Sequence, residues 1–412
     1  MSTSKNPTAE IITIGEELLK GTTLNTNARF LAAELTRLGF SVRRQSSCRD
    51  REGEIARELG EALLRSEAVL LTGGLGPTPD DVTREAVAGF FGVSLRFSKR
   101  QYRLIRGLYA RRGRKVPATV RKEAMFPANA VPLANPFGIA LGFSVTSGGK
   151  TVVVLPGVPD EAEKLFRTRV AGLLRSAFPR LRRRPSLRVN LTGISEPAVM
   201  ERLGRDFFSD VFDFGIYPHP GEISICLAAD RRDVLARLRR KIATRLKPYL
   251  YGWGDASLSQ TVGTMMARKK ATLAAAESCT GGLFASEMTG VPGASRYFKG
   301  SVTAYDNRIK TAVLGVDART ILEKGAVSSQ VARALAQNVR TRMGASVGIG
   351  ITGIAGPAGG TRKKPVGTVY LAVSSAKKTR VWKEFFHGDR TQIQIRAAHK
   401  ALQRLWEHLR NG

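Results

Sequence analysis

The sequence is organised around residues 276–282, which read Ala276-Glu277-Ser278-Cys279-Thr280-Gly281-Gly282. The apolar run 272–276 predicts a buried strand, and residues 283–288 predict a helix. Small residues at a strand-to-helix turn expose backbone N–H groups at the start of the helix, where negative charge is stabilised. Ser278 or Cys279 is therefore a candidate nucleophile, and the amides that follow could hold a developing oxyanion. A serine at such a turn also serves simply as a helix cap, so the turn alone leaves both readings open.

A second segment adds a candidate base. Residues 300–305 predict a strand and residues 306–314 predict the helix after it. Asp306 or Asn307 suits the N-cap, which places Lys310 in or just after the first helical turn. The positive end of the helix disfavours an ammonium there, and partial burial would lower the lysine pKa further. A neutral Lys310 can take a proton from a serine hydroxyl, although the segment by itself also fits a solvated surface lysine.

The N-terminal part of the chain alternates strands and helices. Strands are predicted at residues 9–15, 40–48 and 68–72, and helices at residues 25–38 and 52–65. Short loops between alternating strands and helices indicate a parallel, doubly wound sheet. Ligands bind such sheets beyond the carboxyl ends of the strands.

That rule points to the loop after the third strand, residues 73–81, which read GGLGPTPDD. Its glycines let the backbone approach a ligand closely, Thr78 can cap a helix, and Pro79 suits the first helical position. Asp80 and Asp81 have two readings that their spacing leaves even. They are acidic residues favourable at a helix N-terminus, or oxygen ligands for a divalent cation that bridges a diphosphate.

Length, cysteine count and charge limit the class of protein. A chain of 412 residues predicts two or three domains, and Cys48, Cys226 and Cys279 are too scattered for a disulfide framework or a metal knuckle. No apolar stretch approaches the roughly 18 residues that cross a bilayer, and the N-terminus lacks a signal-peptide core, so we expect a cytoplasmic protein without a membrane partner. The formal charge of +32 would attract any phosphate, but its clusters lack interleaved aromatics. We therefore expect nucleic acid to bind only through non-specific charge.

The residues between the two halves predict a small third domain. A charged, proline-bounded linker (179–185) precedes two predicted strands (187–191 and 222–228) and two predicted helices (196–203 and 232–246). The segment has no GXXG loop of the RNA-clamping kind. We interpret it as a spacer and a dimerisation element, although its basic second helix keeps a nucleic-acid role open.

The remaining C-terminal residues complete a second α/β domain. A predicted helix (328–342) and a buried strand (346–351) deliver the glycine-rich turn 352–357 to the same edge as Ser278. The backbone N–H groups of that turn could line a substrate pocket, although such a turn needs no ligand to form. Arg390 lies just past a strand end and could bind a nucleotide phosphate bidentately, or it could be one more surface arginine.

These C-terminal motifs resemble a known family. Six blocks are similar to the nicotinamide-mononucleotide amidohydrolase domain of the competence/damage-inducible CinA family: AESCTGG (276–282), GASRYFKGSVTAYDNRIK (293–310), GAVSSQVA (325–332), ITGIAGPAGG (351–360), KPVGTVYLAV (364–373) and FHGDR (386–390). The resemblance runs in order from about residue 257 to the C-terminus. It implies that Ser278 and Lys310 hydrolyse the carboxamide of nicotinamide mononucleotide, with Tyr305 and Arg390 as further site residues. The residues implied to bind the substrate are Thr280, Gly281, Gly282, Thr352 and Gly353.

The resemblance extends to the N-terminal half. Four blocks look like the molybdopterin-binding-like domain of CinA proteins: EIITIGEELLKGTTLNTN (10–27), TGGLGPTPDD (72–81), NPFGIALGF (135–143) and LPGVPDE (155–161). Some family members hydrolyse ADP-ribose there with a divalent metal, so the resemblance implies metal ligands at Asp80 and Asp81. The residues implied to bind a nucleotide are Gly73, Gly74, Gly76, Thr78 and Asn25. The third block departs from the family pattern, which has a proline where Leu141 stands.

The predicted architecture is α/β. Two α/β/α domains with mainly parallel sheets (1–175 and 255–412) are joined by a small α+β domain with KH-like topology (176–254), as the resemblance implies. The predicted function is hydrolysis of nicotinamide mononucleotide to nicotinic acid mononucleotide and ammonia, in pyridine nucleotide recycling. We expect a homodimer that needs no cofactor for this step, with Cys279 as the rival nucleophile. The alternatives are a metal-dependent ADP-ribose pyrophosphatase in the N-terminal domain and a non-catalytic, nucleic-acid-associated factor.

Overall fold

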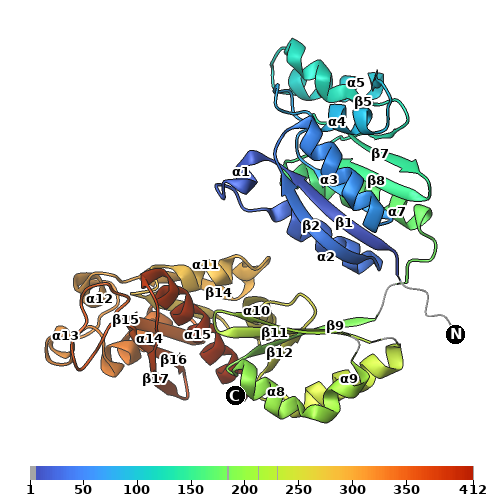
Figure 1. Cartoon of the computed structure of the whole chain (residues 1–412). Helices are drawn as coiled ribbons and strands as arrows, with labels where there is room; N and C mark the ends of the chain where they lie inside the picture. The colour runs from blue at the N-terminus through green and yellow to red at the C-terminus, as the bar shows by residue number, and fades with distance from the viewer. Residues whose placement is uncertain (1–5, 183–184, 212, 230, 412) are drawn as a thin grey trace. The chain divides into compact units, whose positions relative to one another are not determined.

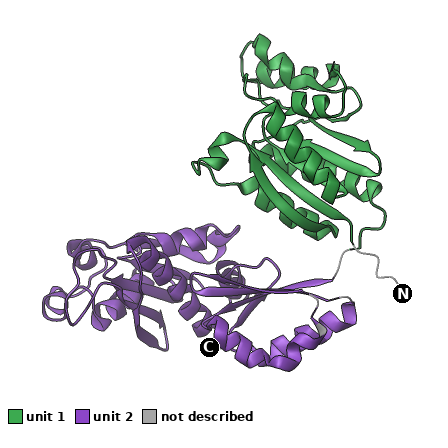
Figure 2. Ribbon diagram, viewed as in Figure 1, with its two compact units in different colours: residues 1–183 green, residues 184–412 purple. Residues whose placement is uncertain are grey.

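The computed structural model describes residues 6–182, 185–211, 213–229 and 231–411 (Figure 1). The chain divides into two compact units, residues 1–183 and 184–412, and each is described by itself (Figure 2). The predicted three-domain division, with boundaries at residues 175 and 254, stays a prediction. Across the described ranges, no helix is both long and apolar enough to cross a lipid bilayer.

A six-stranded sheet forms the centre of the first unit (Figure 1). Its strands, in spatial order, are β2 (Ser41–Cys48), β1 (Thr8–Ile14), β3 (Ala68–Thr72), β8 (Lys150–Leu155), β7 (Gly142–Ser147) and β6 (Val131–Leu133). β1 pairs in parallel with β2 and β3, and β3 pairs in parallel with β8. β7 and β6 pair antiparallel at one edge. The parallel arrangement predicted for the first three strands is therefore confirmed, and an antiparallel edge is added to it.

Both faces of this sheet are covered by helices. In β1, Ala9 and Ile11 lie in the core cluster that includes α2, whereas Ile12 and Ile14 lie in the cluster that includes α3. Successive side chains of a strand point to opposite faces, so a strand that is apolar throughout needs helices on both sides. The helices of this unit are α1 (Glu16–Leu19), α2 (Thr26–Leu38), α3 (Glu52–Arg65), α4 (Thr83–Phe90), α5 (Lys99–Arg111), α6 (Pro159–Leu165) and α7 (Ala171–Ala177).

The helix that the sequence predicts at Pro79 begins later. α4 starts at Thr83, so Thr78 does not cap it and Asp81 does not lie in its first turn. Instead, Oδ2 of Asp81 accepts hydrogen bonds from the N–H (2.9 Å) and the hydroxyl (2.5 Å) of Thr78. This local side-chain turn gives the backbone an alternative to the helix, which explains the wrong prediction.

The C-terminal sheet of the second unit is built around the organising strand. Its order is β14 (Phe298–Thr303), β13 (Leu273–Glu277), β15 (Val347–Gly353), β16 (Thr368–Ser375) and β17 (Thr379–Phe385). β13 pairs in parallel with β14 and β15, and β16 and β17 add two antiparallel strands. The predicted α/β fold class is confirmed, with antiparallel strands again at one edge.

Helices cover both faces of this sheet as well. Ala274 and Ala276 lie in the cluster formed with α14, whereas Ala275 lies in the cluster formed with α10, α11 and α15. Gly350 lets α14 approach closely, because a Cβ atom at Gly350 would collide with the carbonyl oxygen of Ala332. The helices are α10 (Leu258–Arg268), α11 (Leu283–Thr289), α12 (Asn307–Ala312), α13 (Ala318–Lys324), α14 (Ser329–Arg342) and α15 (Arg390–Asn411).

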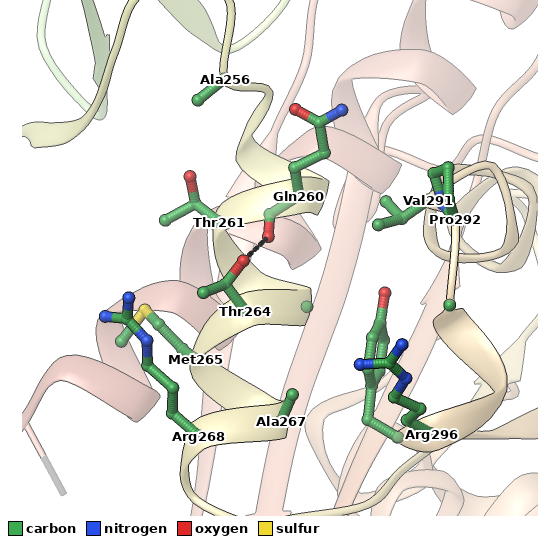
Figure 3. Close-up of a pocket in the computed structure, with 13 residues that line it drawn as sticks. Ala256, Gln260, Thr261, Thr264, Met265, Ala267, Arg268, Val291, Pro292 and Arg296 are labelled. Carbon is green, nitrogen blue, oxygen red and sulfur yellow. Dashed lines mark hydrogen bonds between the residues drawn. The ribbon is translucent and has the colours of Figure 1, made fainter.

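A pocket of about 570 Å³ lies beside α10 (Figure 3). In Figure 3, Gln260 and Thr264 on α10 stand across it from Val291 and Arg296. Arg296 shortly precedes β14, and α10 ends shortly before β13, so the pocket lies near the starts of these strands. Ser278 follows the end of β13, at the opposite edge of the sheet, so this pocket is not part of the site predicted from the sequence.

A four-stranded antiparallel sheet forms the remainder of the second unit. Its order is β10 (Asp213–His219), β11 (Glu222–Ala228), β9 (Ser186–Thr192) and β12 (Leu250–Trp253), and it packs against α8 (Glu196–Leu203) and α9 (Arg232–Arg245). The prediction of only two strands here was wrong, because β10 and β12 were missed. β10 is an edge strand without a buried residue and contains a proline, and β12 has four residues, so neither carries a clear alternating pattern.

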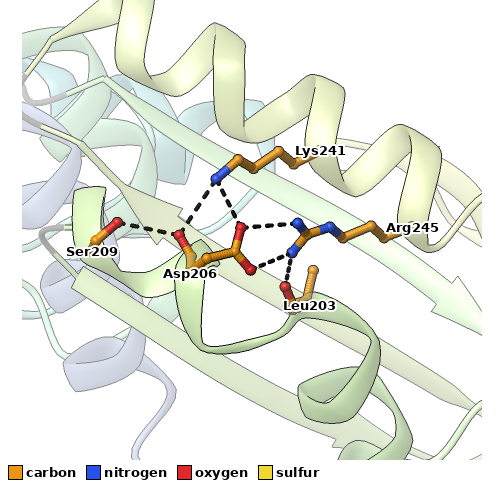
Figure 4. Close-up of polar contacts among 5 residues, drawn as sticks. All are labelled: Leu203, Asp206, Ser209, Lys241 and Arg245. Atoms are coloured by element: carbon orange, nitrogen blue, oxygen red, sulfur yellow. Dashed lines mark hydrogen bonds and ion pairs between the residues drawn. The ribbon is translucent and has the colours of Figure 1, made fainter.

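Asp206 neutralises part of the basic helix α9 (Figure 4). Its carboxylate accepts hydrogen bonds from the guanidinium of Arg245 (2.9 and 3.0 Å) and from Nζ of Lys241 (3.3 Å). The hydrogen bonds from Arg245 lower the pKa of Asp206 to about 2. Two of the cations that suggested a nucleic-acid surface are thus paired within the domain itself.

Candidate active site

Three strand ends bring the C-terminal candidate residues to one edge of the sheet. Glu277, the last residue of β13, lies opposite Thr303 of β14 and Ile351 of β15. The N–H of Ser278 donates to the carbonyl oxygen of Ile351 at 3.0 Å, and the N–H of Ala304 donates to that of Glu277 at 2.7 Å. The segments after all three strands therefore start side by side, as the sequence predicts.

Ser278 lies in a tight turn between β13 and α11. The residue is 8% exposed. The N–H of Gly281 donates to the carbonyl oxygen of Ser278 at 3.1 Å. Gly281 (φ 61°) and Gly282 (φ 104°) both adopt left-handed backbone conformations, which other residues enter only with strain. The two glycines thus have a local structural reason to be present.

The start of α11 is occupied by a side chain that the sequence analysis left without a role. The carboxylate of Glu277, which is 0% exposed, accepts hydrogen bonds from the N–H groups of Gly282, Phe284 and Ala285 at 2.9–3.1 Å. It also accepts one from the hydroxyl of Thr280 at 2.8 Å. The expectation that the helix-start amides could hold an oxyanion was therefore wrong for these three groups. No hydrogen bond to another described residue engages the N–H of Cys279 or Thr280.

Lys310 is buried, not a solvated surface lysine. It is 2% exposed and lies in the first turns of α12, with Asp306 as the N-cap. Its Nζ donates to the backbone carbonyl oxygen of Tyr305 at 2.8 Å. Burial lowers the pKa of Lys310, and the nearby charge of Asp306 opposes that shift. The N–H of Ala304 donates to the carbonyl oxygen of Glu277, so the segment that leads to Lys310 starts beside the Ser278 turn.

Tyr305 and Arg390 form a pair across the site. The hydroxyl oxygen of Tyr305 accepts a hydrogen bond from Nη2 of Arg390 at 2.7 Å, and Nη1 of Arg390 donates to the carbonyl oxygen of Gly356 at 2.7 Å. Tyr305 is 58% exposed, so a ligand can reach its ring. Each terminal nitrogen of Arg390 spends one N–H on a protein partner, which leaves Nε–H and the second N–H of each terminal nitrogen for a phosphate.

Cys279 has the environment of a structural thiol. It is buried, and burial raises the pKa of its thiol to about 12, with the charge of Glu277 acting in the same direction. A Cβ atom at Gly353 would lie 3.0 Å from its Sγ, so that glycine makes room for the thiol. Gln394, which the sequence analysis also missed, donates from Nε2 to the carbonyl oxygen of Cys279 at 2.8 Å.

The hydroxyls of Thr280 and Thr352 have protein partners. Thr280 donates to Glu277, and Thr352, which is buried, donates to the carbonyl oxygen of Ala326 at 2.8 Å. Both residues lie next to the Ser278 turn, but their side chains support the backbone in this structure.

The glycine loop of the first unit lies beside β1. A Cβ atom at Gly73 would collide with the carbonyl oxygen of Ile14, and one at Gly76 would lie 2.5 Å from Oδ2 of Asp81. Gly74 adopts a left-handed conformation (φ 63°). Arg84, buried below the loop, donates to the carbonyl oxygens of Leu75 and Gly76. These glycines are needed for close packing of the loop, whether or not a ligand binds.

Asn25 and Asn27 are among the residues that line a small cavity of about 120 Å³ next to Gly73. Asn25 caps α2 through Ala28 and donates from Nδ2 to the hydroxyl of Thr13 at 2.9 Å. Asn27 is buried and donates to Thr72, but its Oδ1 has no hydrogen-bond partner among the described residues. An unpaired buried acceptor is costly, so Asn27 destabilises the fold unless its Oδ1 finds a donor.

The predicted metal ligands do not form a metal site by themselves. Asp80 is exposed, and one carboxylate oxygen of Asp81 is engaged by Thr78. Among the residues that the structure describes, no group of three or more His, Cys, Asp or Glu side chains is arranged to hold a metal ion. A divalent cation there would need further oxygen ligands, such as those of a diphosphate.

Comparisons with known proteins agree with the resemblance seen in the sequence. The family model described as "CinA C-terminal domain" matches residues 255–409, and the one described as "Probable molybdopterin binding domain" matches residues 10–176. The chain is 40% identical over 409 residues to a CinA-like protein of Gemmatimonas aurantiaca, covering 96% of this chain and 95% of that protein. It is 39% identical over 405 residues to a CinA-like protein of Salinibacter ruber, covering 96% and 98%.

A solved structure is also similar in sequence. The crystal structure of the protein CinA from Thermoplasma acidophilum is 38% identical, covers 42% of this chain and 99% of its own, and has a TM-score of 0.38. The similarity to the curated relatives extends over nearly the whole length of both partners. The chain therefore belongs to the CinA family.

Proposed function

We propose that this protein is a nicotinamide-nucleotide amidase in which Ser278 is the nucleophile and Lys310 is the general base. The observation that carries the proposal is Lys310 itself. An ammonium at 2% exposure is costly unless its pKa falls, and burial lowers that pKa here. A buried lysine with a lowered pKa beside a serine turn is the arrangement that a serine–lysine hydrolase needs.

In the acylation step, the hydroxyl oxygen of Ser278 attacks the carbonyl carbon of the carboxamide while Nζ of Lys310 takes the hydroxyl proton. The carbonyl oxygen becomes an oxyanion. The N–H groups of Cys279 and Thr280 are the donors that the turn leaves for it. When the tetrahedral intermediate collapses, the proton on Lys310 passes to the leaving nitrogen and ammonia departs.

In the deacylation step, Lys310 takes a proton from water and the resulting hydroxide attacks the acyl-serine ester. Collapse of the resulting tetrahedral intermediate breaks the ester bond and releases the pyridine carboxylate, while Ser278 regains its proton from Lys310. The hydrogen bond from Nζ to the carbonyl oxygen of Tyr305 uses one N–H of the neutral amine and leaves its lone pair free for these transfers. This sequence of steps uses only protein groups and water.

The substrate class rests on the family and on charge. The resemblance to the amidohydrolase domain of CinA proteins supports nicotinamide mononucleotide as the substrate. The formal charge of +32 would attract its phosphate. The proposal gives Tyr305, whose ring is exposed, the role of stacking on the pyridinium. Arg390 would meet the phosphate through the N–H groups that its bonds to Tyr305 and Gly356 do not use.

The test is ammonia release from nicotinamide mononucleotide by the full chain and its Ser278→Ala and Lys310→Met variants. Each variant should lose at least about a thousandfold in kcat, because each removes a reacting group. Near-wild-type turnover by either variant would contradict the assigned pair, and a wild-type chain that releases no ammonia would contradict the activity.

A second activity in the first unit is favoured by one observation, the cavity beside Gly73 that Asn25 and Asn27 help to line. We propose that this cavity binds a nucleotide, with the hydrolysis of ADP-ribose as the activity to examine. Release of AMP from ADP-ribose by the full chain, with and without EDTA, tests it. A chain that neither releases AMP nor binds ADP-ribose would contradict this second proposal and leave the amidase untouched.

A homodimer built through the small antiparallel sheet stays a prediction, which sedimentation of the full chain can check. A gel shift at physiological salt tests the nucleic-acid alternative. Binding that disappears as salt rises would be non-specific charge attraction, as the sequence predicts.

A further inference from the structure

We propose that Glu277 is the positioning residue of the Ser278 turn, and that its carboxylate is required for turnover although it does not touch the substrate. The inference rests on the proposed amidase function. It assigns the geometry of the nucleophile and of the oxyanion donors to one buried charge next to Ser278 in the chain. Neither its burial nor its contacts could be deduced from the strand pattern alone.

The carboxylate of Glu277 is saturated with donors from three parts of the domain. Oε2 accepts from the hydroxyl of Thr280 (2.8 Å) and from the N–H groups of Gly282 and Phe284 (both 3.1 Å). Oε1 accepts from the N–H of Ala285 (2.9 Å) and from the hydroxyl of Ser301 on β14 (3.2 Å). Five donors at 0% exposure describe a carboxylate built into the structure, because a buried charge is tolerated only when its hydrogen-bonding capacity is met.

An ordinary helix cap would satisfy the first amides of α11 without burying a charge. The N-cap residue of α11 is Gly282, which has no side chain, and in its place Glu277 reaches over the turn to the first amides. A serine or asparagine at the N-cap would satisfy one of these amides without burying a charge. The carboxylate of Glu277 instead closes a loop of contacts. It belongs to the residue before the nucleophile and holds residues 280–285, so Ser278 and Cys279 are fixed from both sides.

This loop decides which backbone amides remain free. The N–H groups of Gly282, Phe284 and Ala285 are spent on Glu277, and the N–H of Leu283 donates to the carbonyl oxygen of Thr280. Those of Cys279 and Thr280, next to Ser278, are not engaged by other described residues. Glu277 thereby directs the oxyanion to the nucleophile end of the turn. Gln394 supports the same segment from α15 through the carbonyl oxygen of Cys279.

The test compares Glu277→Gln with Glu287→Gln in the full chain. The amide that replaces the Glu277 carboxylate would have one oxygen acceptor, and its NH₂ group would face donors at the other position. Loss of one or two hydrogen bonds to a charged group predicts a kcat roughly 10- to 100-fold lower, with KM for nicotinamide mononucleotide within about threefold. Glu287 lies on the same helix, and no hydrogen bond joins it to the described residues of the turn, so the same chemical change there should leave kcat within about twofold.

Two further measurements separate positioning from general damage. Amide hydrogen exchange at residues 282–285 should accelerate in Glu277→Gln and not in Glu287→Gln, whether or not the chain has amidase activity. Thr280→Val removes one donor and keeps the charge, so it should show a smaller loss of kcat, roughly 3- to 10-fold. If Glu277→Gln does not fold, Thr280→Val decides the matter.

The outcomes are distinguishable. A wild-type chain without amidase activity would contradict the proposed function, and unchanged exchange at residues 282–285 would then contradict the role of Glu277 as well. An active wild type with unchanged kcat in Glu277→Gln, or in Thr280→Val, would overturn the positioning role alone. A fall in kcat with an equal loss of nucleotide affinity would also overturn it, because that pattern indicates a collapsed site.

Discussion

The side-chain amine of Lys310 donates a hydrogen bond to the backbone carbonyl oxygen of Tyr305 at 2.8 Å. Tyr305 in turn accepts a hydrogen bond from Arg390 through its phenol oxygen. One residue therefore holds the candidate base through its backbone and the first residue of α15 through its side chain. Lys310 is five positions from Tyr305 along the chain, whereas Arg390 is 85 positions from it, so the site is closed by tertiary structure.

The pH dependence of the amidase should respond to Asp306. Catalysis needs the neutral amine, so kcat/KM should rise with pH through the pKa of Lys310, which burial holds below its ordinary value. The charge of Asp306 raises that pKa, so Asp306→Asn should move the rising limb to lower pH. Asparagine still caps α12, so the fold should be kept.

A matched control exists on the next helix. Asp317 caps α13 in the same way, through the N–H groups of Arg319 and Thr320, and is not among the charges that shift the pKa of Lys310. The profile of Asp317→Asn should coincide with that of the wild type. A rising limb that stays in place in Asp306→Asn would show that Lys310 is not the group that titrates.

Cys279→Ala should retain amidase activity within about threefold. The thiol is buried and its pKa is raised to about 12, so it supplies almost no thiolate near neutral pH. The measurement is kcat for ammonia release beside that of Ser278→Ala. A Cys279→Ala chain without activity, together with an active Ser278→Ala chain, would transfer the nucleophile role to the cysteine.

Arg390→Lys should lower kcat/KM roughly tenfold or more. Lysine offers one nitrogen on a shorter side chain in place of the two that bond to Tyr305 and Gly356, and these bonds are each worth about 1 kcal/mol. Arg380 is an exposed arginine of β17, and Arg380→Lys is the control that should leave kcat/KM unchanged. Equal steady-state constants in wild type and Arg390→Lys would remove Arg390 from the site.

The stability of the second unit should respond to changes at a buried hydroxyl beside α10 that has no hydrogen-bond partner among the described residues. Tyr297 is 3% exposed and its hydroxyl has no hydrogen-bond partner in the described part of the chain, so Tyr297→Phe should stabilise the fold by about 1 kcal/mol. A Cβ atom at Gly263 would collide with that hydroxyl, so Gly263→Ala should destabilise by about 1–3 kcal/mol. Thermal unfolding of both variants and the double variant checks the pair, since Tyr297→Phe should relieve part of the Gly263→Ala cost. Additive effects would contradict the contact.

Two histidines on α15 should give opposite pH dependences of stability. The hydrogen bond from His399 to Glu222 (3.2 Å) raises the pKa of His399, so its contribution is present below about pH 6.5 and is lost as pH rises through its folded pKa. His399→Gln should therefore cost more, by about 1 kcal/mol, at about pH 5.5 than at about pH 8.5.

His408 is the control with the opposite sign. Burial and the nearby cations Arg380 and Lys269 lower the pKa of His408, so its protonation weakens the fold at low pH. His408→Gln should accordingly stabilise the fold at low pH and leave its stability unchanged at high pH. Unfolding midpoints of the two variants that move in parallel with pH would contradict both assignments.

Many secondary-structure elements could be predicted from local pattern. The bounds of α3, β3, α8 and β11 agree with the sequence prediction residue by residue, because each is a periodic or continuous apolar segment with polar or turn residues beside it. β10 and β12 escaped because an exposed edge strand and a four-residue strand lack that period. The helix expected at Pro79 was displaced by the hydrogen bonds between Asp81 and Thr78.

The features of the candidate site also divide into those that local pattern predicted and those that it missed. The turn at Ser278, the N-cap of α12 and the convergence of three strand ends follow from short-range rules, and the burial of Lys310 agrees with the prediction. The role of Glu277 was missed, although one signal was available. A carboxylate that ends a buried strand ahead of a helix whose N-cap is glycine needs donors, and the helix start has them.

The sequence by itself determined the strand–turn–helix units and the edge of the sheet where they place Ser278, Lys310 and Thr352. Local apolar periods and turn residues act over a few positions, so they can be read without the fold. Only the tertiary structure decided that Glu277 takes the amides of α11, that Arg390 bonds to Tyr305 and Gly356, and that Asn27 keeps an oxygen unpaired among the described residues. Such contacts depend on which buried polar groups meet after packing, and the need to satisfy each of them is a property of the folded chain.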